Sequence, residues 1–414
     1  MKILYIDHYA GSPTLGMEYR PYYLAKEWVK AGHSVTIVGA SFAHTRQKNP
    51  EVQNPITHEE IDGIHYIWIR TPAYQGNGWK RIVNMLAFVL GLFRHLPKLT
   101  STWHPDAVIA SSTYPLDFYP ARRIARRYKA KLVFELHDLW PLSPMELGHM
   151  SRFNPFIMVM QMAEDAWCRQ CDVAVSVLPH ADLHLRTRGL SPEKFVYVPN
   201  GIDLAEWTET SLPLPQEHQA FLDQKRGQGR FLVGYAGAHG VANALDALIE
   251  AAGQLRDYPI DLVLVGTGTE RKQLIAKAKT LELENVYFLN SIPKEVIPKW
   301  LIQMDSLYIG IKFCPLYRFG VSPNKLFDYM MSGKPIIYAI SSGNDPVQEA
   351  GCGLSMTAEC SGAIAEGILT LHQTTPERRL AMGHRGREYV LAKHTYPILA
   401  ANFLNVLKQD ECLA

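Results

Sequence analysis

The feature of this 414-residue chain that most constrains its fold is an alternation of short apolar runs with helical stretches, which stops once and then restarts. Near-continuous apolar strands that alternate with helices are typical of a parallel sheet covered on both faces. In the first half the expected strands are Ile3–Asp7, Ser34–Gly39, His65–Arg70, Ala107–Ser111, Leu132–Leu136, Val173–Val177 and Phe195–Pro199. In the second half they are Phe231–Tyr235, Asp261–Val265, Val286–Leu289, Leu307–Ile311 and Pro335–Ile340.

The interruption, Thr208–Gly229, is polar and rich in Pro, Gln and Glu, so we expect a connecting segment there. A chain of this length exceeds one ordinary hydrophobic core. We therefore predict an α/β fold of two Rossmann-like, doubly wound parallel-sheet domains that face a cleft, residues 1–199 and 200–384. The tail after Pro376 has no strand signal, and its helices, about residues 385–414, are expected to pack back on the first domain.

Charge and cysteine content narrow the function classes. Residues 1–199 carry 22 Lys and Arg against 17 Asp and Glu, and the remainder carries 20 against 23. This bias fits an anionic partner or membrane surface, and ordinary scatter fits equally well. Cys168 and Cys171 form a lone CxxC, which predicts buried thiols and no metal site. No apolar run approaches the ~20 residues of a membrane span, and the chain opens on a strand, so a cytoplasmic protein is expected, without a nucleic-acid partner.

The loop after the first strand is glycine-rich but lacks a dinucleotide fingerprint. Its glycines, Gly11 and Gly16, have the spacing Gly-x4-Gly rather than GxGxxG. Such a turn still lets a ligand approach backbone amides closely. Glu18 and Arg20 are then expected at the rim of the site, with a solvated ion pair as the alternative.

A second candidate site follows Leu132–Leu136, where His137 and Asp138 precede Trp140 and Pro141. Ligands bind at the carboxyl ends of strands in sheets of this kind. An imidazole there can polarise a reacting group or relay a proton near neutral pH. The alternative is a histidine that caps the next segment.

Two glycine turns in the second half predict a diphosphate site. Gly237, Ala238 and His239 lead from a strand toward the helix expected at Ala244–Leu255, and Gly266 and Gly268 follow the next strand. Small residues before a helix N-terminus offer amide donors to phosphate oxygens.

The most informative segment runs from Ser322 through Pro323, Asn324 and Lys325 to Asp328, and Gly333 marks its end. A lysine at the positive end of a helix is unfavourable unless an anion lies between them, which predicts a bound phosphate. Asp328, one turn on, could accept hydrogen bonds from a ribose. An exposed amphipathic helix is the alternative. The chain has no Asp-x-Asp, P-loop, GxSxG or His-Glu-x-x-His.

Taken together, these motifs resemble glycosyltransferase family 4, of the GT-B architecture. The resemblance includes the glycine turn before the first helix, Gly32–Thr36, His137–Pro141, Val198–Asp203 and Val265–Gly268. The segment Ser322–Met330 is similar to the subgroup typified by WbuB, an amino-deoxysugar transferase of bacterial O-antigen assembly.

The resemblance implies a retaining transferase that moves a sugar from a uridine diphosphate donor to a hydroxyl group without a metal. It places His137 near the transferred sugar, the diphosphate on Asn324 and Lys325, and the base beside Leu289–Pro293. The catalytic candidates are His137 and Lys325, and the acceptor candidates are Glu18, Arg20 and Asp138. The donor candidates are Gly16, Gly237, Ala238, His239, Gly266, Gly268, Ile292, Ser322, Pro323, Asn324, Lys325, Leu326 and Asp328.

Two positions depart from the family pattern. Gly320 stands where the first glutamate of a Glu-x7-Glu motif is expected, and Ala238–Gly240 replaces an Arg and a Lys. A donor with altered hydroxyls, such as an N-acetylated 6-deoxy aminosugar like L-FucNAc, is compatible with the missing glutamate. The rival hypotheses are a UDP-sugar 2-epimerase of the same architecture and a non-catalytic nucleotide-sugar-binding protein.

The acceptor side rests on three segments. Trp79–Leu99 is apolar and flanked by cations, Arg122–Lys131 is basic, and Phe153–Met160 is apolar again. They fit peripheral docking on an anionic membrane, with a polyprenyl-diphosphate-linked or other glycan acceptor. Two core helices and a solvated basic face are the alternative.

Overall fold

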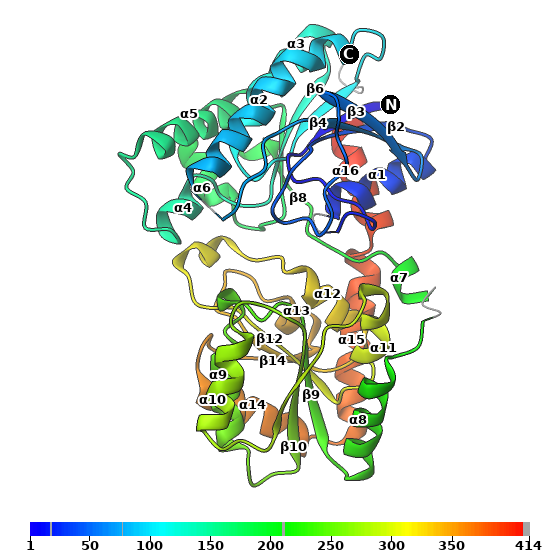
Figure 1. The fold of residues 1–414 in the computed structure, drawn as a ribbon, viewed down its shortest axis with the longest axis vertical. Helices are drawn as coiled ribbons and strands as arrows, with labels where there is room; N and C mark the ends of the chain where they lie inside the picture. Colours follow the sequence, from blue (N-terminus) through cyan, green and yellow to red (C-terminus); the bar gives the residue numbers. More distant parts are fainter. Residues whose placement is uncertain (17–18, 77, 209–211, 409–414) are drawn as a thin grey trace. The chain divides into compact units, whose positions relative to one another are not determined.

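The computed structural model describes residues 1–16, 19–76, 78–208 and 212–408. They form two compact units, Met1–Pro199 together with the segment from Tyr396, and Asn200–Thr395. We call these unit 1 and unit 2 and describe each by itself (Figure 1).

Unit 1 is built on an eight-stranded sheet, parallel except for one edge hairpin. Its central strands are buried on both faces, which is why they appear in the sequence as continuous apolar runs. In spatial order the strands are β3 (Ile56–Ile61), β4 (Ile64–Ile69), β2 (Ser34–Ala40), β1 (Lys2–Ile6), β5 (Ala107–Ala110), β6 (Lys131–Leu136), β7 (Val173–Ser176) and β8 (Phe195–Tyr197).

Helices cover both faces of this sheet. The C-terminal helix packs on α1, where the Trp28 indole donates to the Ala400 carbonyl at 2.9 Å and meets the Phe403 ring edge-on. The helices are α1 (Arg20–Lys30), α2 (Trp79–Leu99), α3 (Phe118–Tyr128), α4 (Leu142–Glu146), α5 (Pro155–Gln170), α6 (Asp182–Leu185) and α16 (Tyr396–Lys408), with short turns η1 (Pro115–Asp117), η2 (Arg186–Arg188) and η3 (Pro192–Lys194).

Unit 2 has a six-stranded, wholly parallel sheet in the order of a Rossmann fold. The strands in space are β11 (Val286–Leu289), β10 (Ile260–Val265), β9 (Phe231–Ala236), β12 (Ser306–Gly310), β13 (Ile336–Ala339) and β14 (Gly353–Ser355). One face carries α9 (Leu245–Gln254), α10 (Arg271–Thr280) and α14 (Ser361–Gln373) (Figure 1). The other carries α8 (Gln216–Gly227), α11 (Ile297–Leu301), α12 (Asn324–Met331), α13 (Pro346–Ala350) and α15 (Pro376–Lys393).

The predicted pair of Rossmann-like sheets is confirmed, and three details are wrong. Two strands were missed: β3 is polar and half exposed, and β14 has three residues, so neither gives an apolar run. The expected connecting segment, which begins where α7 (Ala205–Thr208) ends, contains the helix α8, and Leu222 on α8 reaches the core of unit 2. Residues 385–395 belong to unit 2 rather than returning to unit 1, because α15 packs against α12.

Each sheet has a point where the strand order reverses, between β1 and β5 in unit 1 and between β9 and β12 in unit 2. Ligands of such sheets bind outside the carboxyl ends of the strands at this point. The loops that follow these four strands therefore locate the candidate site within each unit.

Candidate functional site

Lys325 is the centre of the candidate site in unit 2. It lies in the first turn of α12, which follows β12, and its ammonium donates to the Tyr235 hydroxyl at 2.9 Å and to Asn243 Oδ1 at 2.6 Å. Both partners are neutral, and among the described residues no carboxylate lies within ion-pair distance of Nζ. Burial lowers the pKa of Lys325 to about 8. A half-buried cation at the positive end of a helix is thus left without a counter-charge.

The backbone of the loop after β9 lies directly against this lysine. A Cβ added at Gly237 would come within 3.2 Å of Lys325 Nζ, and the φ of Gly237 is +151°. The Ala238 carbonyl accepts from the Tyr235 hydroxyl and from Asn243 Nδ2, and the Ala238 side chain is exposed. Tyr235 and Asn243 therefore fix the loop and the lysine together.

The turn after β10 supports that loop from beneath. A Cβ on Gly266 would lie 1.9 Å from the Gly237 carbonyl oxygen, and one on Gly268 would lie 2.3 Å from the His239 carbonyl oxygen. These two glycines, predicted to let a ligand approach, are required because the neighbouring loop fills the space. The structure places them behind the Gly237 loop.

His239 is also directed inward. Its side chain is fully buried, both ring nitrogens lack a hydrogen-bond partner within the described part of the chain, and burial, with Arg271 and Lys325 nearby, lowers its pKa to about 4. A neutral ring packed between Tyr235 and Phe288 cannot supply the positive charge of the family's Arg and Lys. The charge at this end of β9 comes from Lys325.

Of the residues around the start of α12, some are engaged in the fold and others are exposed to solvent. Ser322 is tied to Asn200, whose amide donates to its hydroxyl at 3.0 Å, and Pro323 is the N-cap residue. Asn324 is exposed beside the first turn. Leu326, also predicted to contact the donor, has its side chain fully buried in the core of unit 2, because the periodicity of the helix turns it inward.

Asp328 is half-buried one turn further along α12. Its Oδ1 accepts from the Trp207 indole at 3.3 Å, and burial, with the Glu206 carboxylate nearby, raises its pKa to about 7. A carboxyl group of this kind, partly exposed and weakly bonded, can still take hydroxyl donors. Ile292, in the loop after β11, is partly buried against the same core.

Gly320 has a conformation that explains the missing glutamate. Its φ is 94° and its ψ is 171°, a region that is essentially restricted to glycine. The next residue, Val321, exchanges two hydrogen bonds with the Asn344 side chain, of 2.8 and 3.0 Å, which hold the loop in this shape. A glutamate at position 320 would strain the loop.

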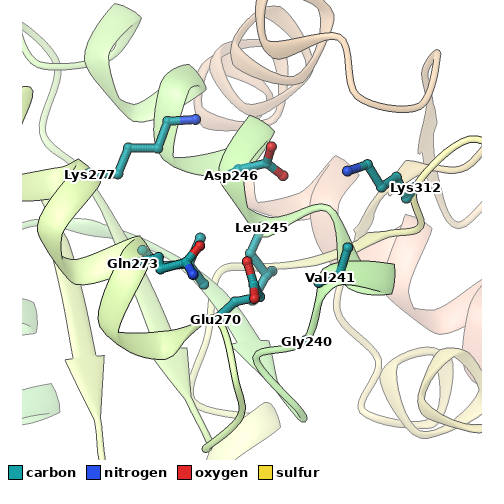
Figure 2. Close-up of a pocket in the computed structure, with 9 residues that line it drawn as sticks. Gly240, Val241, Leu245, Asp246, Glu270, Gln273, Lys277 and Lys312 are labelled. Atoms are coloured by element: carbon teal, nitrogen blue, oxygen red, sulfur yellow. The ribbon is translucent and has the colours of Figure 1, made fainter. Parts of the chain in front are cut away.

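A cavity of about 240 Å³ adjoins the same edge of the sheet (Figure 2). It is lined by Gly240 and Val241, by the carboxylates of Asp246 and Glu270, and by Lys312, among others. Neither Lys325 nor Gly237 lines it, and its carboxylates Asp246 and Glu270 are balanced by Lys277 and Lys312, so its lining has no excess of positive charge for a diphosphate. The diphosphate candidate is therefore the Lys325 turn and not this cavity.

In unit 1 the ends of β5 and β6 bring together a buried charged group. Glu135, fully buried, accepts from Arg20 Nε at 2.9 Å, from the Ser111 hydroxyl at 2.7 Å and from the Tyr5 hydroxyl. Arg20 also donates to the carbonyls of Val198 and Pro199 at 2.9 and 2.6 Å. The expected position of Arg20 at an open rim is wrong, because its guanidinium neutralises Glu135 inside the unit.

His137 lies above this group, with its side chain 18% exposed. Its Nε2 is 2.7 Å from Ser111 Oγ and 3.5 Å from Glu135 Oε2. Because the Ser111 hydroxyl donates to Glu135, it accepts from His137, which assigns the proton to Nε2 and leaves Nδ1 as the variable nitrogen. Burial lowers the pKa of His137, but the Glu135 carboxylate outweighs this and raises it above the usual value.

The other candidate residues of unit 1 have no contact with His137 or Glu135 among the bonds given above. Asp138 accepts from the Leu139 amide and the Ser143 hydroxyl, so its bonds are local to the turn before α4, and burial raises its pKa. Gly16 has a φ of +75° in the loop after β1, and Glu18 lies outside the described residues. Cys171 is buried, as is Cys168, and burial raises the pKa of the Cys171 thiol to about 12.

Sequence reasoning missed the partners of the two central residues. Glu135, Ser111 and Tyr5 support His137, and Tyr235 and Asn243 support Lys325. The sequence feature that could have identified Glu135 and Ser111 is their position, since both stand at the carboxyl ends of predicted strands. Within the described chain, no three His, Cys, Asp or Glu side chains are grouped to hold a metal ion.

Comparison with known proteins assigns the same function class to both units. A "Glycosyl transferase 4-like domain" matches residues 16–201, and "Glycosyl transferases group 1" matches residues 230–374. The chain is 22% identical over 298 residues to an Escherichia coli (strain K12) protein named as a colanic acid biosynthesis glycosyl transferase, WcaI, covering 69% of this chain and 70% of that one.

Solved structures share the fold. Sucrose-phosphate synthase from Thermosynechococcus elongatus covers all of both chains with a TM-score of 0.72 at 16% identity. Anabaena HepE, solved in complex with UDP and glucose, covers 99% of both chains with a TM-score of 0.66 at 17% identity. With a glycosyl transferase domain in each Rossmann-like unit, the chain belongs to the glycosyltransferases of the GT-B type.

Proposed function

We propose that this glycosyltransferase is a retaining, metal-independent enzyme that uses a UDP-sugar donor. The transferred sugar is an N-acetylated 6-deoxy aminosugar such as L-FucNAc. The acceptor is a glycan or a polyprenyl-diphosphate-linked glycan of bacterial O-antigen or another surface polysaccharide, and the reaction takes place in the cytoplasm.

The observation that carries the proposal is the uncompensated Lys325 ammonium at the start of α12. The departing diphosphate gains negative charge as the bond to the anomeric carbon breaks, and preorganised positive groups stabilise that charge most. Lys325 is held in place by Tyr235 and Asn243, so no reorganisation is needed when the charge develops. The helix N-terminus adds backbone donors at the same point.

A nucleoside diphosphate also suits the rest of this edge. The Asp328 carboxyl lies one helical turn from Lys325, so it could accept hydrogen bonds from the ribose hydroxyls of a nucleotide whose diphosphate is bound at Lys325. Anabaena HepE, of the same fold, has been solved with UDP and with UDP-glucose. The uridine donor is proposed on these grounds.

The role proposed for His137 follows from which of its ring nitrogens carries the proton in the free protein. With Nε2–H committed to Ser111, Nδ1 is the atom that can meet a substrate hydroxyl, and the raised pKa keeps part of the ring charged near neutral pH. A charged ring donates from Nδ1 to an oxygen of the transferred sugar. None of the side chains assigned to the site above is proposed as a covalent nucleophile, so departure and attack on the same face are proposed.

The donor sugar is proposed from the shape of the Gly320 loop. Because position 320 has a backbone conformation restricted to glycine, the loop cannot present a carboxylate to donor-sugar hydroxyls. A sugar that has lost its 6-hydroxyl and carries an N-acetyl group loses least from that absence. Thermal shift with a panel of UDP-sugars tests this, because a tight ligand stabilises by mass action.

Lys325→Ala is the decisive variant for the reaction. We expect transfer from the UDP-sugar to fall by roughly two to four orders of magnitude, since one partner of a buried charge pair is removed. Lys272→Ala, an exposed lysine on α10 of the same unit, is the matched control and should transfer normally. Near-normal transfer by the Lys325 variant would contradict the proposal.

Two further measurements separate the alternatives. Donor incubated without acceptor should stay unchanged, whereas conversion to its 2-epimer would identify an epimerase. Donor binding without transfer to any acceptor would identify a nucleotide-sugar-binding protein.

Metal independence has its own test. Transfer at an unchanged rate in EDTA is expected for the metal-independent mechanism.

A further inference from the structure

Helix α2 has apolar residues on two opposite faces. Its inner face buries Met85, Phe88, Leu92 and Leu96 against unit 1. Its outer face carries Trp79, Val83, Leu86 and Leu90, all exposed, with Trp79 at 69% and Leu90 at 67%. The outer residues recur at intervals of three and four, so they form one stripe along the helix.

The segment of α5 has the same two-faced character. Its inner residues Ile157, Met160, Ala163 and Trp167 are buried. Phe153, just before the helix, and Met158, Val159 and Met162 on it are exposed. The inner faces of α2 and α5 share one hydrophobic cluster, in which Met85 and Val89 meet Met160 and Ala163 around η1. The two helices are therefore parts of one layer.

Helix α3 contacts both α2 and α5 and supplies the charge. Phe93 of α2 and Tyr119, Arg122, Arg123 and Arg126 of α3 line an open pocket of about 580 Å³. The Gln170 side-chain oxygen accepts from Arg122 and, at 3.4 Å, from Arg126, and the side chains of Arg123 and Arg126 are exposed. Helices α2 and α3 together contain eight Lys and Arg and no Asp or Glu. Among the described residues, no carboxylate is within ion-pair distance of these three arginines.

The length of α2 raises the question of a membrane span. Contrary to the sequence-based expectation, this 21-residue helix is long and apolar enough to cross a membrane by length and composition, with a third of its most apolar stretch buried. Its inner face, however, is committed to the sheet: a Cβ on Gly91 would lie 2.4 Å from Ile69 Cγ2 of β4. In the folded unit the helix is therefore a surface element with one face exposed.

We propose that unit 1 docks on an anionic phospholipid bilayer through a docking face, which consists of the outer residues of α2, those of the α5 segment, and the arginine pocket of α3. Leu and Met side chains would enter the acyl boundary, and Trp79 would lie at the headgroup level. The arginines would bind lipid phosphates, for which a guanidinium offers paired donors. The inference does not depend on the donor chemistry; it deepens the proposed function by identifying the surface that receives a lipid-linked acceptor.

Co-sedimentation of the full chain with vesicles tests the proposal. Vesicles of phosphatidylcholine with phosphatidylglycerol should bind the chain, vesicles of phosphatidylcholine alone should bind it much less, and added salt should weaken binding. Leu90→Glu should weaken partitioning by about tenfold or more, because a leucine that enters the apolar region is replaced by a charge. Arg123→Ala and Arg126→Ala should each weaken it by about fivefold.

A matched control distinguishes docking through this face from nonspecific adsorption to the vesicles. Leu380 on α15 of unit 2 is 70% exposed, so Leu380→Glu makes the same change at an equally exposed leucine and should leave vesicle binding unchanged. Circular dichroism and thermal melting confirm that each variant is folded. Equal loss in the Leu90 and Leu380 variants would overturn the docking face.

Two other outcomes also overturn the proposal. One is the absence of binding to anionic vesicles at low salt. The other is a dimer in light scattering that Leu90→Glu dissociates without vesicle binding, which would make a second copy the occupant. The assay contains no nucleotide sugar, so a chain that binds vesicles but transfers no sugar would contradict only the proposed function.

Discussion

Proton uptake on UDP binding is the sharpest consequence of the Lys325 environment. Burial lowers the pKa of the free lysine to about 8. A diphosphate within about 4 Å would favour the charged form and raise the pKa again. Tyr235 and His239 stay neutral between pH 7 and 9, since the pKa of Tyr235 is raised by burial and that of His239 is about 4. The pKa of Asp328 is about 7, so this carboxyl is ionised at pH 9, and the proton count at pH 9 reports on Lys325. Lys325 is thus the group expected to take up the proton.

The magnitude follows from the position of that pKa. In the free protein about one tenth of the lysine is neutral at pH 7, about half at pH 8 and about nine tenths at pH 9. Binding should therefore take up about 0.1, 0.5 and 0.9 proton, and the dissociation constant for UDP should weaken by about tenfold from pH 7 to pH 9. The ligand contributes little, because its phosphate titrates near pH 6.

Isothermal titration calorimetry in buffers of different ionisation enthalpy counts these protons. Lys325→Arg is the matched control, because a guanidinium stays charged and should show no uptake and little change in affinity with pH. Wild-type uptake near zero at pH 9 would refute the reasoning, since it would mean that the free lysine is already charged. Uptake that persists in Lys325→Arg would assign the proton to another group.

Three further variants, one of them with a matched control, probe the structural support of the two sites. Arg20→Met leaves Glu135 buried without its counter-charge and should lower the free energy of unfolding by about 3–5 kcal/mol in urea denaturation. Because the pKa of Glu135 is lowered on folding, the stability it contributes is present above its unfolded pKa and is lost as the pH falls, so the deficit of the variant should shrink in acid. Gly320→Ala should cost about 1–3 kcal/mol, whereas Gly253→Ala in helix α9, where a Cβ meets only ordinary contacts, should stabilise by about 0.5–1 kcal/mol. Gly268→Ala would push against the loop after β9 and should weaken UDP binding in calorimetry; unchanged affinity would contradict the role given to that packing.

Local patterns in the sequence were sufficient for the architecture. Apolar runs such as Leu132–Leu136 and Phe231–Tyr235 mark strands that are buried on both faces, and each predicted strand has a counterpart in the two sheets. The sequence also located Lys325 and His137, because turn residues and strand ends are visible along the chain. The exposed strand β3 was missed, since its polar residues do not alternate with a buried face.

Only the tertiary structure decided what surrounds these residues. Arg20 and Glu135 are 115 positions apart, and Tyr235 and Lys325 are 90 apart. Their pairing depends on which strands become neighbours: α1, which carries Arg20, follows β1, and Glu135 is on β6. No local period encodes that order, because it is set by how the whole sheet buries its faces.

The same distinction holds for the charges and for the surface. The sequence by itself determined two Rossmann-like sheets, a lysine at a helix start and a histidine at a strand end. The fold decided that Arg20 is an internal counter-ion, that His239 is buried and neutral, and that α2 and α5 each keep an apolar stripe exposed. Burial and proximity create these properties, because a pKa and an exposed face depend on every element packed around a side chain and not on its neighbours along the chain.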